Sequence, residues 1–203
     1  MLTVLDIGIG NIGSVQNALR FLGFEFRIAT TSAELSDASK IIFPGVGNFF
    51  TASKTLHATG MVNAIRSKVL DDKTPILGVC LGMQLLADVG YEGGQSKGLG
   101  LIEGEVVPIE LEDKALTIPH MGWNTVSGNS SALFDGIGDG ECYYFVHSYE
   151  VKLKDQSVCV GYTDHGRGIV ATFSKDQIHG AQFHPEKSQK AGLKLLRNFV
   201  ELC

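Results

Sequence analysis

The segment PILGVCLGMQLL, residues 75–86, joins an apolar strand-like run to a helix-like run through a cysteine between two glycines. A strand that passes directly into a helix is typical of α/β folds with a parallel sheet. Gly78, Cys80 and Gly82 form G-x-C-x-G, the cysteine form of the nucleophile elbow, a sharp turn that holds one side chain over the sheet edge. The glycines allow close backbone approach, and we expect strain of about 1–3 kcal/mol at Cys80. The alternative is a buried cysteine that packs as a small hydrophobe.

The first half of the chain alternates short apolar runs with segments of helical period, which predicts βαβ units and a parallel sheet. The nearly continuous apolar runs, expected of strands covered on both faces, are Leu2–Ile7, Lys40–Phe43 and Pro75–Cys80. From about Glu103 the chain changes to strand-like pieces separated by Gly, Asp and Asn turns. We therefore predict one α/β domain, residues 1–203, with a mostly parallel central sheet, flanking helices and an antiparallel extension in the C-terminal half.

The last segment, SQKAGLKLLRNFVELC, is predicted to be a packing helix with Ser188 as a plausible N-cap. Its expected buried face consists of Leu193, Leu196, Phe199, Val200 and Cys203. Ligands of open α/β sheets bind beyond the carboxyl ends of the strands. Three loops, at Gly8, Pro44 and Cys80, follow predicted strand ends and are expected to converge there.

Composition excludes several functional classes. The net charge of −5, from 17 basic and 22 acidic residues, leaves no basic stripe for nucleic acid. No apolar run approaches the roughly 20 residues that span a bilayer, and the N-terminus lacks a basic signal-peptide start, so we expect a cytoplasmic protein without membrane contact. The four cysteines show no CxxC pair and no zinc-site spacing, which argues against a disulfide framework and a metal site.

The stretch GIGNIG matches the dinucleotide-binding pattern G-x-G-x-x-G through Gly8, Gly10 and Gly13. That interpretation needs an acidic residue at the end of the second strand, where the sequence has Thr30 and Thr31. We therefore favour a glycine-rich turn at the mouth of the site, and we expect no cofactor.

Six histidines compete as the base that a cysteine nucleophile needs. His57 and His165 are expected to be solvated, and His179 to lie on the solvent face of its strand. His184 differs because FHPE ends a strand and places Glu186 two residues on, where a carboxylate can orient the imidazole and stabilise its charged form. The alternative is a surface histidine beside a carboxylate. A zinc deaminase also carries H-x-E, but the required downstream P-C-x-x-C is missing.

Acyl transfer also needs amide donors for the developing oxyanion. Leu81, at the start of the helix after the nucleophile, offers one. The loop PGVG, residues 44–47, follows the neighbouring strand and could offer the amide of Val46 or Gly47. The alternative for PGVG is an ordinary turn.

Together, PGVGNF, GVCLGMQ and FHPEKS resemble the class I, triad-type glutamine amidotransferases over essentially the whole chain. Within that family, PHMGWN and YYFVHSY are most similar to glutaminases of imidazole glycerol phosphate synthase. The resemblance implies a flavodoxin-like sheet and hydrolysis of glutamine to glutamate and ammonia. It implies a thioester on Cys80, with His184 as base, Glu186 as its orienting carboxylate, and oxyanion donors from Leu81 and, when correctly oriented, Val46.

The resemblance also assigns residues to substrate and partner. Those expected to bind the amino-acid part of glutamine are Gly47, Gln84, Ser148 and Tyr149. Those expected to face a synthase (cyclase) subunit in a heterodimer, which would receive ammonia through a channel, are Asn11, Trp123, Tyr144 and Lys187. Cys142 stands where the resemblance suggests an aromatic residue.

Three other interpretations remain at this stage. The same glutaminase could serve a different amidating synthase, for instance one that acts on surface sugars. The chain could be a stand-alone peptidase or γ-glutamyl hydrolase of the same fold. It could also be a binding module that has kept the fold without catalysis, although both nucleophile and base are present.

Overall fold

A computed structural model describes residues 1–10, 12–111, 115–128 and 131–203. Its centre is a seven-stranded sheet with the order β11-β12-β13-β4-β3-β1-β2. The five strands that run parallel are β1 (Leu2–Leu5), β2 (Arg27–Ala29), β3 (Lys40–Gly45), β4 (Ile76–Cys80) and β13 (Ile178–Ala181). Two antiparallel strands, β12 (Gly168–Lys175) and β11 (Cys159–Asp164), complete one edge.

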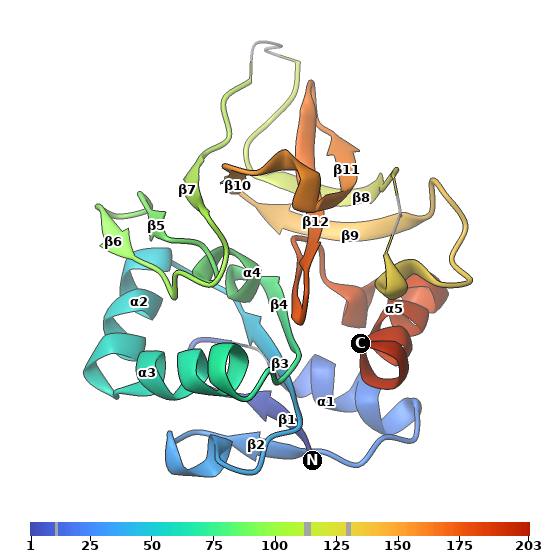
Figure 1. Cartoon of the computed structure of the whole chain (residues 1–203). Coiled ribbons are helices and arrows are strands. Elements are labelled where there is room, and N and C mark those ends of the chain that lie inside the picture. Colours follow the sequence, from blue (N-terminus) through green and yellow to red (C-terminus); the bar gives the residue numbers. More distant parts are fainter. Residues whose placement is uncertain (11, 112–114, 129–130) are drawn as a thin grey trace.

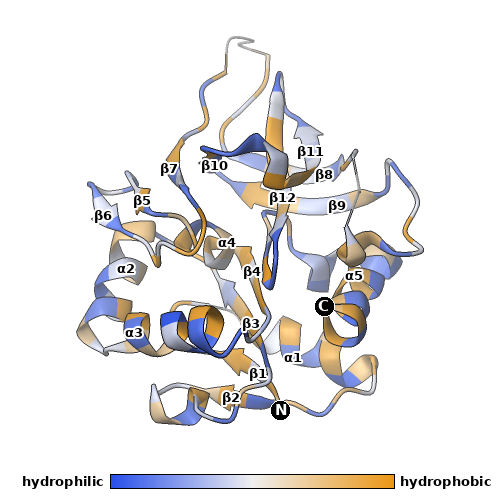
Figure 2. Ribbon diagram, in the orientation of Figure 1, coloured by the Kyte–Doolittle hydropathy of each residue, from blue (hydrophilic) through white to orange (hydrophobic). Residues whose placement is uncertain are grey.

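Helices cover both faces of this sheet (Figure 1). One face carries α1 (Ile12–Phe21) and α5 (Gln189–Leu202), and the other carries α2 (Phe49–Ala58), α3 (Met61–Arg66) and α4 (Leu81–Leu85). Successive strand residues alternate between the two cores, so Ile41 and Phe43 pack on one side and Ile42 on the other. Figure 2 accordingly shows apolar central strands between helices that are apolar on one side.

Two smaller sheets extend the fold beyond the carboxyl ends of the parallel strands (Figure 1). The four-stranded sheet contains β10 (Tyr149–Leu153), β7 (Gly104–Pro108), β5 (Val89–Gly90) and β6 (Ser96–Lys97). The two-stranded sheet pairs β8 (His120–Thr125) with β9 (Cys142–His147). Short 3₁₀ turns occur at Ala33–Leu35, Ala132–Phe134, Gln156–Val158 and Pro185–Lys187.

The predicted α/β class, with a parallel first half and an antiparallel C-terminal extension, is confirmed. The helical region between β3 and β4 breaks at Gly60, whose φ is +70°, and ends in a π turn over Ser67–Asp71. The C-terminal helix has the expected bounds. Of its expected buried face, Leu196 and Phe199 are buried, whereas Leu193, Val200 and Cys203 are only partly buried against the same core, and Leu195 is buried in addition. No described helix is long and apolar enough to cross a membrane.

His179 is not on a solvent face, contrary to the sequence-based expectation. Only 6% of it is exposed, because helix α5 covers this face of β13, with the Phe199 ring 5.9 Å from the His179 ring, and β12 pairs alongside β13 in the sheet. Its Nδ1 atom lies 3.0 Å from the hydroxyl of Ser174, and burial together with the charge of Lys40 lowers its pKa to about 4. His179 is therefore a neutral core residue.

Glycine lets α4 lie directly on the backbone of β3 and β4. A Cβ atom on Gly82 would lie 1.8 Å from the carbonyl oxygen of Phe43, and one on Gly78 would lie 2.7 Å from the backbone nitrogen of Met83. Real Cβ atoms do not approach other atoms this closely, so neither position accepts a larger residue without displacing the helix. The spacing of these glycines thus fixes how the chain turns after Cys80.

The variant Gly82→Ala tests this packing. Alanine favours helix over glycine, so local propensity alone would stabilise the variant. We expect the opposite, a loss of about 1–3 kcal/mol or more in the free energy of unfolding, because the new methyl group overlaps the Phe43 carbonyl. Urea unfolding followed by circular dichroism measures the loss.

Gly138→Ala is the matched control, because a Cβ there would meet nothing closer than 3.7 Å. It should unfold at nearly the wild-type urea concentration. Wild-type stability in Gly82→Ala would contradict the close-packing argument.

Candidate active site

Cys80 ends β4 and directly precedes α4, as predicted for a nucleophile elbow. Its backbone angles, φ 54° and ψ −112°, lie in a region that residues with a Cβ rarely adopt. Such a conformation costs about 1–3 kcal/mol and persists only where the surrounding structure enforces it. Here the packing of Gly78 and Gly82 enforces it, and the predicted strained turn is confirmed.

His184 and Glu186 form a buried pair beside this turn. Nδ1 of His184 lies 2.8 Å from Oε1 of Glu186, and their side chains are only 3% and 4% exposed. Burial on its own lowers the pKa of His184, but hydrogen bonding and charge attraction to Cys80 and Glu186 outweigh burial and raise it to about 9. The imidazole is therefore mainly protonated, and positively charged, at neutral pH.

Nε2 of His184 is left without a hydrogen-bond partner among the described residues. Cys80 lies near enough to raise the pKa of the ring, yet the contact is looser than a well-formed hydrogen bond. Contacts between a nucleophile and its base often tighten only when substrate binds. The arrangement supplies a thiol, a base and a carboxylate in the order that nucleophilic acyl transfer requires.

A cavity of about 180 Å³ opens above Cys80. The residues predicted from sequence that line it are Val46, Gly47, Cys80, Leu81, Gln84, Ser148 and Tyr149. Its remaining lining residues, which sequence analysis did not single out, are Glu92, Val146 and His147. The folded chain therefore brings all the predicted substrate-binding positions to one cavity.

Glu92 is the carboxylate of this cavity. Its Oε2 atom accepts a 2.7 Å hydrogen bond from the backbone amide of Phe49 at the start of α2, which fixes the side chain in place. Glu92 lies in the turn YEGG, outside every motif, so no sequence signal marks it. Its negative charge suits a cationic group such as the ammonium of an amino acid.

Two buried histidines hold the cavity wall. His147 Nδ1 lies 2.9 Å from the Tyr149 carbonyl and must donate to it, so His147 Nε2 accepts from His120 Nδ1 at 2.9 Å. His120 Nε2 in turn accepts from the amide of Asn124 at 3.1 Å. Burial lowers the pKa of His120 to about 3 and that of His147 to about 4, so both rings stay neutral. No ring nitrogen remains for proton transfer, and the pair acts as a clamp on Ser148 and Tyr149.

The predicted oxyanion donors differ in this structure. Leu81 is the first residue of α4, where backbone amides have no partner within the helix. The amide of Val46, however, donates to the carbonyl of Ile9 at 3.0 Å. Val46 therefore does not act as a donor to the site in this conformation, and its assignment requires the peptide to rotate. That rotation changes ψ of Gly45 and φ of Val46, and the glycine at position 45 tolerates such a change because it has no Cβ.

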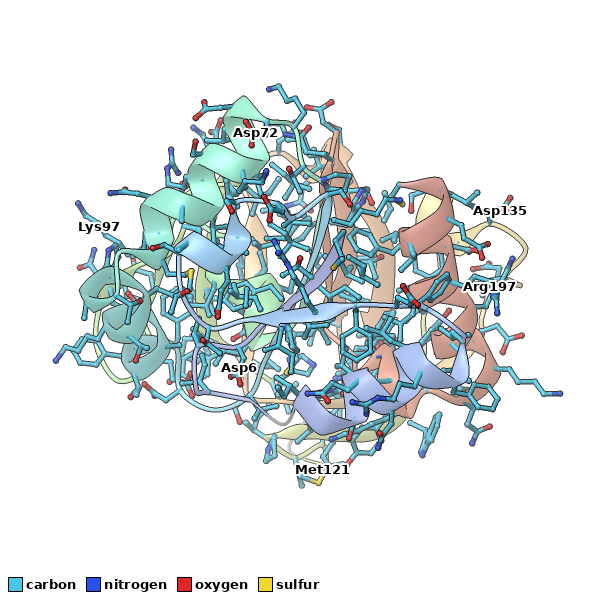
Figure 3. All side chains as sticks on the ribbon, turned by 90° about the horizontal axis from the view of Figure 1, so that it is seen from below. Asp6, Asp72, Lys97, Met121, Asp135 and Arg197 are labelled. Carbon is cyan, nitrogen blue, oxygen red and sulfur yellow. The ribbon has the colours of Figure 1, made fainter. Side chains whose placement is uncertain are left out.

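Three of the four residues predicted to face a partner lie together beside His184. Trp123 is 49% exposed and pairs with Tyr144 across β8 and β9, with ring centroids 6.0 Å apart. The ammonium of Lys187 lies 5.7 Å from the centre of the Tyr144 ring. The fourth, Asn11, lies outside the described residues. Met121 adds a 61% exposed side chain at the periphery of the molecule (Figure 3).

Among the described residues, no group of three or more His, Cys, Asp or Glu side chains could hold a metal ion. Of the four cysteines, Cys80 is the buried one, and Cys142 is exposed on β9.

Comparison with known proteins agrees with this geometry. Residues 3–203 match the family described as glutamine amidotransferase class-I, and the chain belongs to that family. It is 47% identical to "Imidazole glycerol phosphate synthase subunit HisH 1" of Campylobacter jejuni over 100% of both chains. It is 43% identical to the HisH subunit of Aquifex aeolicus, covering 97% of this chain and 94% of that one.

Solved structures share the fold at lower identity. One described as a glutamine amidotransferase superimposes with a TM-score of 0.78 at 20% identity, covering 99% of this chain and 97% of that chain. A glutamine amidotransferase of Thermotoga maritima gives a TM-score of 0.66 at 18% identity, covering 98% and 80%. The resemblance recognised in the sequence motifs is thus confirmed for both family and fold.

Proposed function

We propose that this chain is the glutaminase subunit of an imidazole glycerol phosphate synthase. It hydrolyses L-glutamine to L-glutamate and ammonia and passes the ammonia to a synthase (cyclase) subunit, which makes imidazole glycerol phosphate and AICAR in histidine biosynthesis. The observation that carries the proposal is the strained Cys80 beside the buried His184–Glu186 pair, at a cavity lined by the residues expected to bind the amino-acid part of glutamine. The HisH relatives support the choice of synthase. A cytoplasmic location is part of the same proposal.

In the proposed reaction, the sulfur of Cys80 attacks the carboxamide carbon of glutamine while His184 holds the thiol proton. His184 then gives that proton to the departing nitrogen. Ammonia departs, and a γ-glutamyl thioester remains on Cys80. Water, deprotonated by His184, attacks the thioester, and glutamate leaves with the thiol restored. Glu186 keeps the ring oriented and stabilises its charged form throughout.

The cavity fits the amino-acid part of glutamine. Glu92 and the side-chain oxygen of Gln84 offer acceptors for the α-ammonium group. The backbone at Gly47 and the clamped turn of Ser148 and Tyr149 can contact the α-carboxylate. The substrate's length then places its carboxamide over Cys80.

The partner-facing surface lies directly behind the base. The backbone carbonyl of Tyr144 accepts a 2.9 Å hydrogen bond from the backbone amide of His184, and the centroids of the two rings are 6.5 Å apart. Exposed Met121 and Trp123 supply the large apolar side chains that anchor interfaces. A synthase docked there would receive ammonia close to where His184 releases it.

The Val46 amide makes activity depend on the partner. With that amide bound to Ile9, the oxyanion would have one donor, Leu81, in place of two. Loss of one such donor typically slows turnover about 10²–10³-fold. We therefore expect the isolated chain to hydrolyse glutamine slowly. Docking of the synthase should accelerate turnover by rotating the peptide that carries the Val46 amide.

Glu92→Gln tests the substrate assignment. Glutamine in that position still accepts from the Phe49 amide, so α2 keeps its start, but the negative charge is gone. We expect KM for glutamine to rise about 10- to 100-fold with a much smaller change in kcat, because the lost bond is to a charged group. Glu25→Gln, at an exposed site just before β2 and outside the cavity lining, is the control and should leave KM unchanged. An unaltered KM in Glu92→Gln would remove Glu92 from the site.

Cys80→Ala tests the reaction and the partner together. Mixed with a synthase subunit, the wild type should release ammonia from glutamine at least about 100-fold faster than alone. Cys80→Ala should lose glutamine-dependent synthesis, yet the same complex should still use free ammonium. Coupled assays of glutamate and of the synthase product measure both.

Retained glutaminase activity in Cys80→Ala would refute the thioester mechanism. If the isolated wild-type chain hydrolyses glutamine rapidly and the synthase does not change that rate, the result would instead favour the stand-alone hydrolase.

A further inference from the structure

Gln182 is a fully buried amide that the reaction outlined above does not use. It lies between β13 and His184, with its backbone amide bound to the Ala171 carbonyl at 2.8 Å. A buried amide costs free energy unless both its oxygen and its nitrogen find partners. The partners of Gln182 therefore indicate why this position carries an amide among apolar neighbours.

Both ends of the amide reach functional groups. Nε2 of Gln182 donates to Sγ of Cys80 at 3.9 Å, and Oε1 accepts from Nε2 of Gln84 at 3.1 Å. The reverse orientation would turn an oxygen toward the sulfur and set two NH₂ groups against each other. The surroundings thus permit one orientation.

The bond to Gln182 also orients Gln84. The Nε2 atom of Gln84 donates to the Tyr149 carbonyl at 3.0 Å as well as to Gln182, so both of its N–H groups are used. The side-chain oxygen of Gln84 is then left for the cavity that Gln84 lines. A continuous series of hydrogen bonds joins the nucleophile to the wall of the substrate cavity.

The hydrogen bonds that the sulfur can make change when the thiol loses its proton. The neutral thiol can donate to the carbonyl of Val146, 3.9 Å away, but a thiolate has nothing to donate there. The N–H of Gln182 remains a donor, and a hydrogen bond to a charged acceptor is stronger than one to a neutral acceptor. Gln182 therefore favours the reactive form of Cys80.

We propose that Gln182 is a positioning residue that stabilises the Cys80 thiolate and, through Gln84, aims an acceptor at the α-ammonium of the substrate. The second part rests on the glutaminase function proposed above. The first part concerns the thiol alone and can be tested without glutamine.

The test compares Gln182→Met and Gln182→Glu with the wild type. Methionine keeps the length of the side chain without a donor, and ionised glutamate keeps the shape with a charge that opposes the thiolate. The rate at which iodoacetamide alkylates Cys80 is measured against pH in the full-length chain, with mass spectrometry of the peptide that contains Cys80. Gln177→Met is the matched control, because Gln177 bonds the Val69 carbonyl at the opposite end of β13.

We expect Gln182→Met to slow alkylation at neutral pH about tenfold and to move the profile about one pH unit upward, the scale of one hydrogen bond to a charged group. Gln182→Glu should shift it further, and Gln177→Met should not shift it. In the complex with synthase, Gln182→Met should also raise KM for glutamine. Folded Gln182 variants with the wild-type alkylation profile would overturn the proposal, and this readout stands even if the wild type does not hydrolyse glutamine.

Discussion

The contact between α4 and the backbone of β3 governs the whole site. Because Gly82 lies against the Phe43 carbonyl, the chain must turn sharply after β4, and Cys80 takes a left-handed conformation at that turn. The sulfur is thereby held at the carboxyl edge of the sheet, where the β13 end delivers His184. Cys80 is the last residue of β4 and His184 follows shortly after β13, and these two strands pair directly in the sheet.

Around that turn, burial and neighbouring charged groups have opposite effects on the pKa of His184. His184 is deeply buried, which by itself would keep it neutral, yet Glu186 and Cys80 raise its pKa to about 9. The clamp formed by His120 and His147 shows the opposite outcome, since two imidazoles without a carboxylate become neutral when buried. The neighbouring Cys80 and Glu186 side chains thus separate a histidine suited to move protons from two that fix a loop.

Sequence analysis could predict what local spacing determines. The turn at Cys80 follows from two glycines, and the function of His184 follows from a carboxylate two residues away. Gln182 could not be predicted because its amide partner lies 98 residues away, and Glu92 belongs to no motif. The direction of the Val46 amide could not be predicted either, because the same sequence is compatible with both orientations of that peptide.

The central claim is that Cys80 attacks glutamine and carries the acyl group. Acid quenching during turnover, with the synthase subunit present, traps any covalent intermediate for mass spectrometry. The account predicts a γ-glutamyl adduct on the peptide that contains Cys80, formed within the first turnover and lost as glutamine is exhausted. Hydrolysis of glutamine with no adduct on Cys80, or with an adduct on another residue, would contradict it.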